Sequence, residues 1–230
     1  MTHQETKRAV ALAALKELPK EGTIGLGSGS TAALFIEALG QLIQQGRSFV
    51  GVPTSQASRE LAEKFKIPTL PDSGPWNIAV TVDSADEVSQ TCHSMIKGGG
   101  GAHTREKIVY TASQRTIIII EERKLSPHLG EKASVPVEVL TFGHAQTAER
   151  LRMFGKVTLR MKDGAPWLTD SNHLIYDVSI KKIINPAALD RALSNISGVV
   201  ETGLFCKKPD MLLIGRGSEV KRLFTPPSFK

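Results

Sequence analysis

Residues 23–46, TIGLGSGSTAALFIEALGQLIQQG, contain a short apolar run, a turn rich in glycine and serine, and a longer amphipathic segment. Residues 23–27 predict a β-strand, and residues 30–46 predict a helix because their apolar side chains recur at helical intervals. A strand that turns directly into a helix is the repeating element of α/β proteins. The stretch therefore indicates an α/β fold.

Strand and helix patterns continue to alternate around this unit. Thr2 and Glu5 have the spacing of a capping box at the start of an amphipathic helix. Residues 117–120 are four consecutive isoleucines, as expected of a parallel strand covered on both faces. Further strands are expected at 48–54, 67–70, 77–83 and 211–215, and further helices at 55–65 and 218–224. We expect the tail, residues 225–230, to be disordered.

Residues 135–205 follow a different order, β-α-β-β-α-β, which is the ferredoxin-like pattern. Strands are expected at 135–142, 156–161, 167–178 and 198–205, with a hairpin turn across 161–166. Helices are expected at 144–155 and 185–196, the second with Pro186 near its start. We therefore divide the chain into a larger α/β domain, residues 1–130 and 206–230, and a smaller lobe, residues 131–205.

The composition of the 230-residue chain is that of an ordinary globular protein, with 40% hydrophobic and 23% charged residues. No segment approaches the roughly 20 apolar residues that a membrane-spanning helix needs. The net charge of +6 is compatible with nucleic-acid binding, but the basic residues are scattered and only 5% of residues are aromatic. A small anionic substrate explains the charge better, with surface lysines of no particular role as the alternative.

Two cysteines, Cys92 and Cys206, are too few for a disulfide framework or a zinc set. We expect both to be small buried side chains in a reducing compartment. Charges interrupt the apolar run at the N-terminus, so this segment is not expected to be a signal peptide. These features favour a cytoplasmic protein.

The turn GLGSGST, residues 25–31, is the first candidate site. Backbone amides at a helix N-terminus bind anions, and Ser28, Ser30 and Thr31 add hydroxyl donors. The alternative is a tight turn with an N-cap serine. Ser30 stands where a dinucleotide fingerprint needs glycine, and no lysine follows as in a nucleoside-triphosphate loop. A phosphate on a small metabolite is the remaining interpretation.

The segment DSADEV, residues 83–88, follows a predicted strand, so Asp83 and Asp86 lie at a strand's carboxyl end, where open α/β sheets bind ligands. The alternative is that Asp83 caps a turn while Asp86 and Glu87 are solvated. A metal site is not favoured, because no histidine or third carboxylate has ligand spacing.

The stretch IKGGGGAHTREKIV, residues 96–109, contains four consecutive glycines between Lys97 and Glu106. Glycine is costly to order, which suggests that this loop closely approaches a ligand. Glu106 is predicted in the first turn of the following helix. The alternative is that Glu106 only favours the helix dipole and that Lys97 is a surface charge. Lys124, after the isoleucine strand, is either a further phosphate contact or an exposed lysine.

Together and in this order, GLGSGSTA, DSADE, KGGGGAHTREK and the lysine of EERK resemble the motifs of the type A ribose-5-phosphate isomerase family. PVEV, TDSNHLIYDV and GVVETGLF continue the resemblance over nearly the whole chain. It implies a Rossmann-like parallel-sheet domain, a ferredoxin-like α+β lobe and a reaction without a cofactor. It also implies a homodimer or larger assembly, and we expect a homodimer or homotetramer with the lobe as a possible interface. From the composition we expect neither nucleic-acid nor membrane partners.

The resemblance also implies roles for particular residues. Glu106 would be the proton acceptor, with Lys97, Asp83 and Asp86 as further catalytic residues. The substrate-binding set would be Ser28, Gly29, Ser30, Thr31, Asp83, Ser84, Ala85, Asp86, Lys97, Gly98, Gly99, Gly100 and Lys124. The chain departs from the family pattern at Ser28 (usually threonine), Ser84 (usually glycine) and His103 (usually apolar). If the backbone at Ser84 needs positive φ, serine would be strained there.

The expected reaction interconverts D-ribose 5-phosphate and D-ribulose 5-phosphate through an enediolate, in the non-oxidative pentose phosphate pathway. One alternative is a non-catalytic sugar-phosphate-binding module of similar fold, which would not need Lys97 and Glu106. Another is an acyl-transferring relative with a glutamate nucleophile, which would need a coenzyme A site that the sequence does not indicate.

Overall fold

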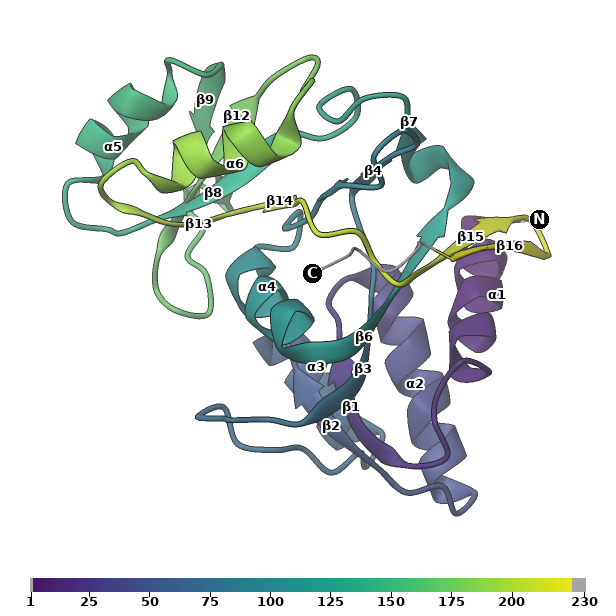
Figure 1. Cartoon of the computed structure of the whole chain (residues 1–230). Helices are drawn as coiled ribbons and strands as arrows, with labels where there is room; N and C mark the ends of the chain where they lie inside the picture. The colour runs from purple at the N-terminus through teal and green to yellow at the C-terminus, as the bar shows by residue number, and fades with distance from the viewer. Residues whose placement is uncertain (1, 225–230) are drawn as a thin grey trace. The chain divides into compact units, whose positions relative to one another are not determined.

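The computed structural model describes residues 2–224, and the chain forms two compact units. Within the described residues, unit 1 comprises 2–84, 105–123 and 209–224, and unit 2 comprises 85–104 and 124–208. Figure 1 gives the order of the elements along the chain.

Unit 1 contains a six-stranded sheet in the order β16-β15-β6-β3-β1-β2. All neighbouring pairs are parallel except β15 and β16. Residues 117–120 lie in the middle of this sheet, opposite Met211–Ile214 of β15, which confirms the parallel isoleucine strand. The strands are β1 (Gly22–Leu26), β2 (Phe49–Pro53), β3 (Ile78–Asp83), β6 (Ser113–Glu121), β15 (Met211–Arg216) and β16 (Glu219–Phe224).

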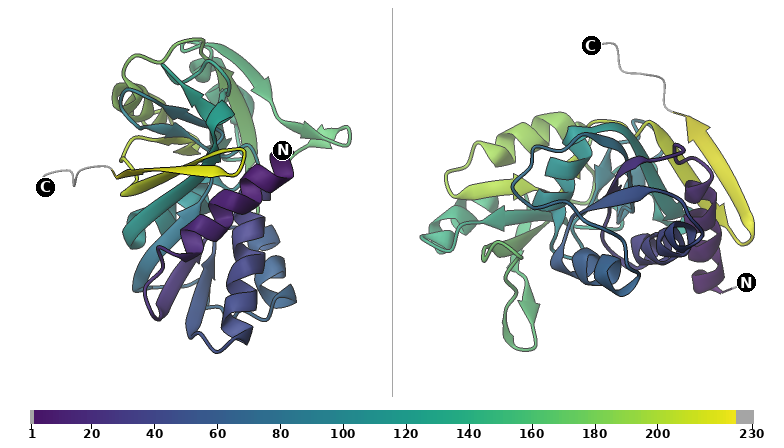
Figure 2. Two further views of the ribbon diagram at one scale, coloured as in Figure 1. Left: turned by 90° about the vertical axis from the view of Figure 1, so that its right-hand side faces the viewer. Right: turned by 90° about the horizontal axis from the view of Figure 1, so that it is seen from below.

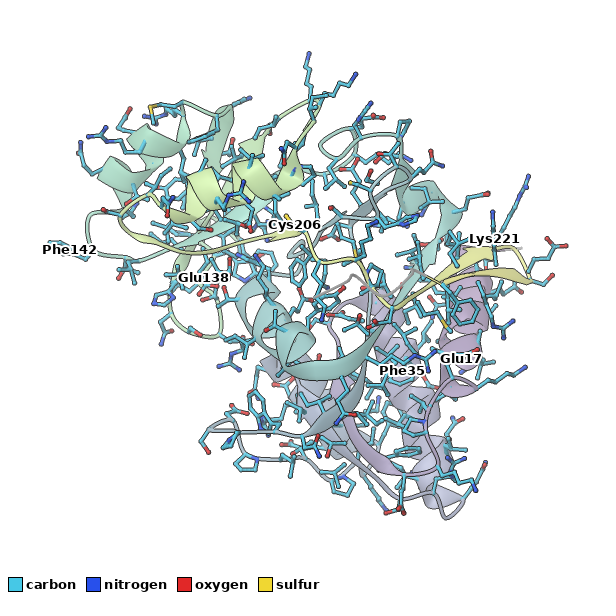
Figure 3. All side chains as sticks on the ribbon, viewed as in Figure 1. Glu17, Phe35, Glu138, Phe142, Cys206 and Lys221 are labelled. Carbon is cyan, nitrogen blue, oxygen red and sulfur yellow. The ribbon has the colours of Figure 1, made fainter. Side chains whose placement is uncertain are left out.

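Helices cover both faces of this sheet (Figure 1). The main core packs Phe35 of α2, labelled in Figure 3, with Ile24, Val82 and Ile119 of the sheet. Gly25 faces the opposite side, where a Cβ on it would lie 2.8 Å from Val109 of α4. The helices are α1 (His3–Leu15), α2 (Ser30–Gln44), α3 (Gln56–Lys64) and α4 (His103–Ala112).

Unit 2 contains the expected ferredoxin-like arrangement. Its four-stranded antiparallel sheet has the order β13-β8-β12-β9, and α5 and α6 lie between its strands along the chain. Asn185 caps α6 by accepting the N–H of Ala188, and Pro186 occupies the first helical turn as expected. The elements are β8 (Val135–Val139), α5 (His144–Leu151), β9 (Lys156–Leu159), β12 (Leu174–Ser179), α6 (Pro186–Ser194) and β13 (Val199–Thr202).

A second small sheet in unit 2 has the order β14-β5-β4-β7. Because its strands pair with one another, residues 85–104 and 124–130 fold in the same compact unit as the lobe that we expected at 131–205. Its strands are β4 (Glu87–Ser89), β5 (Met95–Ile96), β7 (Leu125–Ser126) and β14 (Leu204–Phe205), and β7 follows the short 3-10 helix η1 (Glu122–Lys124). A hairpin of β10 (Met161–Lys162) and β11 (Ala165–Pro166) projects from unit 2 in Figure 2.

The expected helix at 218–224 is wrong, because this segment is the antiparallel strand β16. Arg216 and Glu219 face each other across a two-residue turn, and Gly217 has φ +60°, which suits a tight hairpin. The strand expected at 67–70 is only an isolated bridge between Gly51 and Thr69. Helix α5 ends at Leu151 instead of 155. The expected disorder of 225–230 lies outside the described residues.

The N-terminal capping box is confirmed, since Thr2 and Glu5 bond each other's backbone N–H groups. Cys92 and Cys206 are both free thiols and are half-buried, so neither is the fully buried side chain we expected. Over the part of the chain that the structure describes, no helix is long and apolar enough to cross a membrane.

The buried isoleucines should dominate the stability of unit 1. We expect Ile119→Ala to lower the free energy of unfolding by about 2–5 kcal/mol, because Ile119 is fully buried and its truncation leaves a cavity. Ile184→Ala removes the same atoms from a residue that is 72% exposed, and it should change the free energy of unfolding by less than about 0.5 kcal/mol. Urea titrations of both variants measure this contrast, and equal losses would contradict the assignment of Ile119 to the core.

Candidate active site

The glycine-rich turn of unit 1 joins β1 to α2. Gly29 is the N-cap of α2 with φ +93°, and as glycine it has no side chain that could cap the helix. Gly27 must also be glycine, because a Cβ there would lie 2.5 Å from the Asp83 Cα atom. Gly29 and Ser30, at the start of this 15-residue helix, are exposed. This is the geometry of an anion site at a helix N-terminus.

Ser28 contributes to this turn in a way that the sequence did not indicate. Its hydroxyl lies 2.8 Å from Thr54 Oγ1, 2.7 Å from Ser55 Oγ and 3.1 Å from Ser58 Oγ. Ser58 in turn donates to the carbonyl of Gly27. Their position could have indicated this contact, because Thr54, Ser55 and Ser58 follow β2, and β2 pairs with the strand β1 that precedes Ser28.

Lys7 of α1 also reaches this turn. Its Nζ donates a 3.0 Å hydrogen bond to the Ser30 hydroxyl, at an exposed position. Lys7 and Ser30 lie 23 residues apart, so no local pattern in the sequence links this lysine to the turn. The turn thus combines helix amides, hydroxyls and one cation, which are the groups that bind phosphate.

Asp83 is the last residue of β3 and is fully buried. Its Oδ1 accepts the backbone N–H of Ser28 at 3.0 Å and of Ser84 at 2.7 Å. The Ser84 hydroxyl donates to the Ser28 carbonyl at 3.1 Å. Among the described non-glycine residues, positive φ occurs only at Lys66, His93, Asp163 and Asn172. Ser84 does not have positive φ, so serine is not strained at this position, where the family usually has glycine.

Glu106 lies in the first turn of α4, as predicted, and only 4% of it is exposed. A carboxylate removed from water is a stronger interaction partner, and its proton affinity depends on the groups around it. The alternative of a solvated carboxylate that merely favours the helix dipole does not fit this burial. Glu106 belongs to the same unit as Ser28–Thr31 and Asp83.

Lys97 belongs to unit 2 and is buried, with 2% exposed, which excludes the surface-charge alternative. Its N–H donates to the Gly203 carbonyl at 2.9 Å, and its Nζ lies 5.4 Å from the centroid of the Phe205 ring. The ring face attracts the ammonium group. Both contacts come from β14 and the residue before it, so the small sheet of unit 2 fixes the start of the glycine loop.

His103, the unexplained residue of this loop, packs against Gly98. Gly98 has φ +100°, and a Cβ on it would lie 2.7 Å from His103 Nδ1. Glycine is therefore required at 98 for both conformation and space. His103 is fully buried and begins α4.

Asp86 connects two of the predicted substrate-binding segments of unit 2. Its Oδ2 accepts the N–H of Gly99 at 2.7 Å, and its Oδ1 lies 3.9 Å from Lys124 Nζ. About a third of the Asp86 side chain is exposed, so it remains accessible to a ligand. These residues line a pocket of about 480 Å³ with Lys132, Ala133, Ser134, Pro136, Thr158, Arg160, Asp177 and Ser179.

Glu87 is not solvated, contrary to the alternative considered for this motif. It is fully buried, and its carboxylate accepts a hydrogen bond from Ser126 Oγ at 2.5 Å. It also accepts four backbone N–H groups, from Gly130, Glu131, Lys132 and Ala133. Glu87 therefore fixes the 126–133 segment, part of which lines the pocket.

Glu138 is a second buried carboxylate that the sequence did not single out. It accepts hydrogen bonds from Thr169 at 2.9 Å and from His173 at 2.8 Å, and it bonds Thr104 in the first turn of α4. The PVEV and TDSNH segments thus form one network. Among the residues from 2 to 224, no three His, Cys, Asp or Glu side chains could hold a metal ion together.

A family model for ribose 5-phosphate isomerase A (phosphoriboisomerase A) matches residues 50–219. The chain belongs to this family. Ribose-5-phosphate isomerase A of Bacillus mycoides is 43% identical over 201 residues, which cover 86% of this chain and 90% of the relative. The enzyme of Thermosynechococcus vestitus is 40% identical over 218 residues, with 92% of each chain covered.

Solved structures confirm the fold of this isomerase family for the chain. Ribose 5-phosphate isomerase A from Methanocaldococcus jannaschii superposes with a TM-score of 0.92 at 37% identity, covering 97% of this chain and 100% of that one. A D-ribose-5-phosphate isomerase in complex with phospho-erythronic acid gives a TM-score of 0.94 at 36% identity, covering 98% and 100%. The predicted Rossmann-like sheet with a ferredoxin-like lobe is therefore correct.

The isomerase-type motifs fall into two sets, one in each unit. Unit 1 holds Ser28–Thr31, Asp83, Ser84 and Glu106, and it brings Ser28, Asp83 and Ser84 into direct contact. Unit 2 holds Ala85, Asp86, Lys97, Gly98, Gly99, Gly100 and Lys124, with Asp86 between Gly99 and Lys124.

Loss of the Glu87 carboxylate should destabilise the protein. We expect Glu87→Gln to lower the free energy of unfolding by about 2–4 kcal/mol, because each carboxylate oxygen accepts two backbone N–H groups and the amide replaces one oxygen by an NH2 group that cannot accept them. Glu63→Gln, at an exposed glutamate of α3, serves as the control and should change it by less than about 0.5 kcal/mol. Urea unfolding measures both, and similar values for the two variants would contradict the structural role of Glu87.

Proposed function

We propose that this chain interconverts D-ribose 5-phosphate and D-ribulose 5-phosphate, in the non-oxidative pentose phosphate pathway. Family membership supports an isomerase acting on ribose 5-phosphate. The observation that carries the proposal is Glu106, a buried carboxylate in the unit that also holds an anion-binding helix N-terminus. One relative of known structure is a complex with phospho-erythronic acid, a phosphorylated sugar acid.

In the proposed mechanism Glu106 takes the proton from C2 of the open-chain aldose. The C2–H electron pair forms the C1–C2 double bond, and the C1 carbonyl becomes an enediolate oxygen. Lys97 stabilises this oxygen as a desolvated cation, and the loop amides assist it. Glu106 then returns the proton to C1 as the C2 hydroxyl loses its proton to the C1 oxygen. The ketose forms without a net change in protons or electrons.

The other predicted residues would bind and orient the substrate. Ser28, Gly29, Ser30 and Thr31 would bind the phosphate, which places the reacting end and leaves binding energy for the chemical step. Asp83 and Asp86 would bind hydroxyl groups and assist opening of the furanose ring. The remaining substrate contacts would come from Ser84, Ala85, Gly98, Gly99, Gly100 and Lys124.

A direct assay tests the proposal. The purified chain is incubated with ribose 5-phosphate, with and without a chelator, and ribulose 5-phosphate is measured. We expect the same rate in both conditions, since the mechanism uses side chains only. No product in either condition would favour the non-catalytic sugar-phosphate-binding alternative, and activity lost with the chelator would show that a metal takes part.

Removal of the base should separate catalysis from binding. We expect Glu106→Gln to lower kcat by about 10²- to 10⁴-fold while KM changes little, because the amide keeps the shape but cannot accept the proton. Glu63→Gln, at an exposed position of α3, is the control and should retain wild-type kinetics. Steady-state kinetics on ribose 5-phosphate measure both constants, and near wild-type turnover of Glu106→Gln would refute the assignment.

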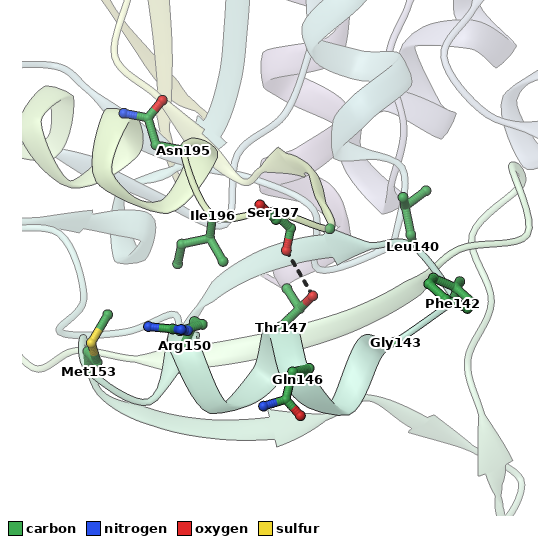
Figure 4. A pocket seen from close by; sticks show the side chains of 11 residues that line it. Leu140, Phe142, Gly143, Gln146, Thr147, Arg150, Met153, Asn195, Ile196 and Ser197 are labelled. Carbon is green, nitrogen blue, oxygen red and sulfur yellow. Dashed lines mark hydrogen bonds between the residues drawn. The ribbon is translucent and has the colours of Figure 1, made fainter.

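We further propose that the chain forms a homodimer or homotetramer in the cytoplasm, with the ferredoxin-like lobe at the interface. Support comes from an apolar pocket of about 660 Å³ beside α5 (Figure 4). At its rim, Phe142 is 93% exposed and Met153 is 70% exposed, and Phe142 lies at the outer edge of the lobe in Figure 3. Large exposed apolar side chains grouped in this way are typical of protein contact sites.

A polar residue in place of Phe142, at the rim of this pocket, should weaken the assembly. We expect Phe142→Ser to shift the protein toward monomer, because the apolar area that the ring buries in the interface is lost. Sedimentation velocity over a range of concentrations measures the shift. Leu168→Ser changes an apolar side chain that is 46% exposed elsewhere in unit 2, and it should leave the assembly intact. A monomeric wild-type protein would refute the proposal.

A further inference from the structure

Arg160 and Asp177 form a pair in unit 2 for which the sequence indicated no role: Asp177 lies in the TDSNHLIYDV segment, and Arg160 lies outside all of the quoted motifs. Arg160 directly follows β9, and Asp177 lies in the adjacent strand β12. Arg160 Nε donates to Asp177 Oδ2 at 2.9 Å, and Arg160 Nη2 donates to the other carboxylate oxygen. Only 11% of the arginine side chain is exposed, and its guanidinium carbon lies 5.5 Å from the Trp167 ring centroid. The pair is therefore oriented and largely desolvated.

The remaining nitrogen of the guanidinium group reaches the glycine loop. Arg160 Nη1 donates to the Gly98 carbonyl at 2.7 Å and to the Gly99 carbonyl at 3.2 Å. Asp177 occupies the other edge of the same planar group. One rigid cation thus joins a carboxylate on one edge to two backbone carbonyls on the other.

The peptide unit between Gly98 and Gly99 is held at both of its polar ends. Its carbonyl accepts from Arg160, and its N–H donates to Asp86 Oδ2 at 2.7 Å. In a trans peptide the C=O and N–H bonds point in opposite directions, so these two hydrogen bonds fix the rotation of the peptide plane. Without them, consecutive glycines would have many accessible conformations.

We propose that Arg160, oriented by Asp177, is a positioning residue of the isomerase reaction. It fixes the Gly98–Gly99 and Gly99–Gly100 peptides, and so directs the amides of the loop that begins at Lys97. Arg160 acts through the loop, by the hydrogen bonds of its Nη1 to the Gly98 and Gly99 carbonyls. The inference rests on the proposed function, in which this loop contacts the reacting sugar.

Arginine is required for this role because of its shape. Its planar fork bonds a carboxylate with two nitrogens while a third faces another acceptor. Lysine keeps the charge but cannot reach Asp177 and both carbonyls in fixed directions. We therefore expect Arg160→Lys to lower kcat by about 10- to 100-fold, because a small displacement of the loop amides from the reacting sugar slows the chemical step by such factors. KM should stay within about threefold, because phosphate binding is assigned to Ser28–Thr31.

The kinetic experiment compares Arg160→Lys, Arg160→Met and Asp177→Asn with Arg191→Lys, at an exposed arginine of α6. The control should keep wild-type constants, whereas the three variants should lose kcat. In the double variant of Arg160→Lys with Asp177→Asn, the loss should be smaller than the product of the single losses, because the two residues act as one unit. A kcat within twofold of wild type for Arg160→Lys, or multiplicative losses, would overturn the proposal.

Hydrogen–deuterium exchange provides a readout that does not depend on activity. In the absence of substrate, Arg160→Lys and Arg160→Met should exchange the amides of residues 98–101 at least tenfold faster than wild type. Amides of β12 should keep their protection, which shows that the lobe remains folded. Unchanged exchange at 98–101 would overturn the positioning role even if the wild-type protein proved inactive, an outcome that would refute only the proposed function.

Discussion

Backbone N–H groups of irregular loops need hydrogen-bond acceptors, and in this protein five residues, 83–87, supply three carboxylates that meet this need. Asp83 accepts the N–H groups of Ser28 and Ser84 in unit 1. In unit 2, Asp86 accepts the N–H of Gly99, and Glu87 accepts those of four residues between 130 and 133. Hydrogen bonds to charged acceptors are about twice as strong as neutral ones, so these loops become ordered.

Ordered loops matter because both candidate ligand-binding loops are rich in glycine. The turn 25–31 and the loop 98–101 need glycine where φ is positive or where a Cβ would clash, as at Gly27 and Gly98. Such loops have many conformations unless side chains fix them. Here the backbone groups of the two loops are held by hydrogen bonds to the carboxylates of the DSADE segment and from Arg160. The preorganisation that electrostatic catalysis requires therefore comes from residues around the loops.

Local patterns identified most elements correctly, because each depends on residues that are neighbours in the sequence. The isoleucine run, the strand–turn–helix of 22–44 and the β-α-β-β-α-β order of the lobe are of this kind. The failures occurred where the pattern was short. Residues 218–224 fit a helix turn or a strand equally well by composition, and pairing with β15 decided for a strand.

The sequence by itself determined the α/β class, the family resemblance, the two glycine loops and the position of Glu106 in the first turn of a helix. Tertiary structure alone decided that Lys97 is buried, that Ser28 bonds the 54–58 hydroxyls, and that Arg160 bonds Gly98, a residue 62 positions away. The reason is physical. Motifs and periodicity reflect local backbone geometry, whereas a side chain's burial and partners depend on which distant strands pair and in which register.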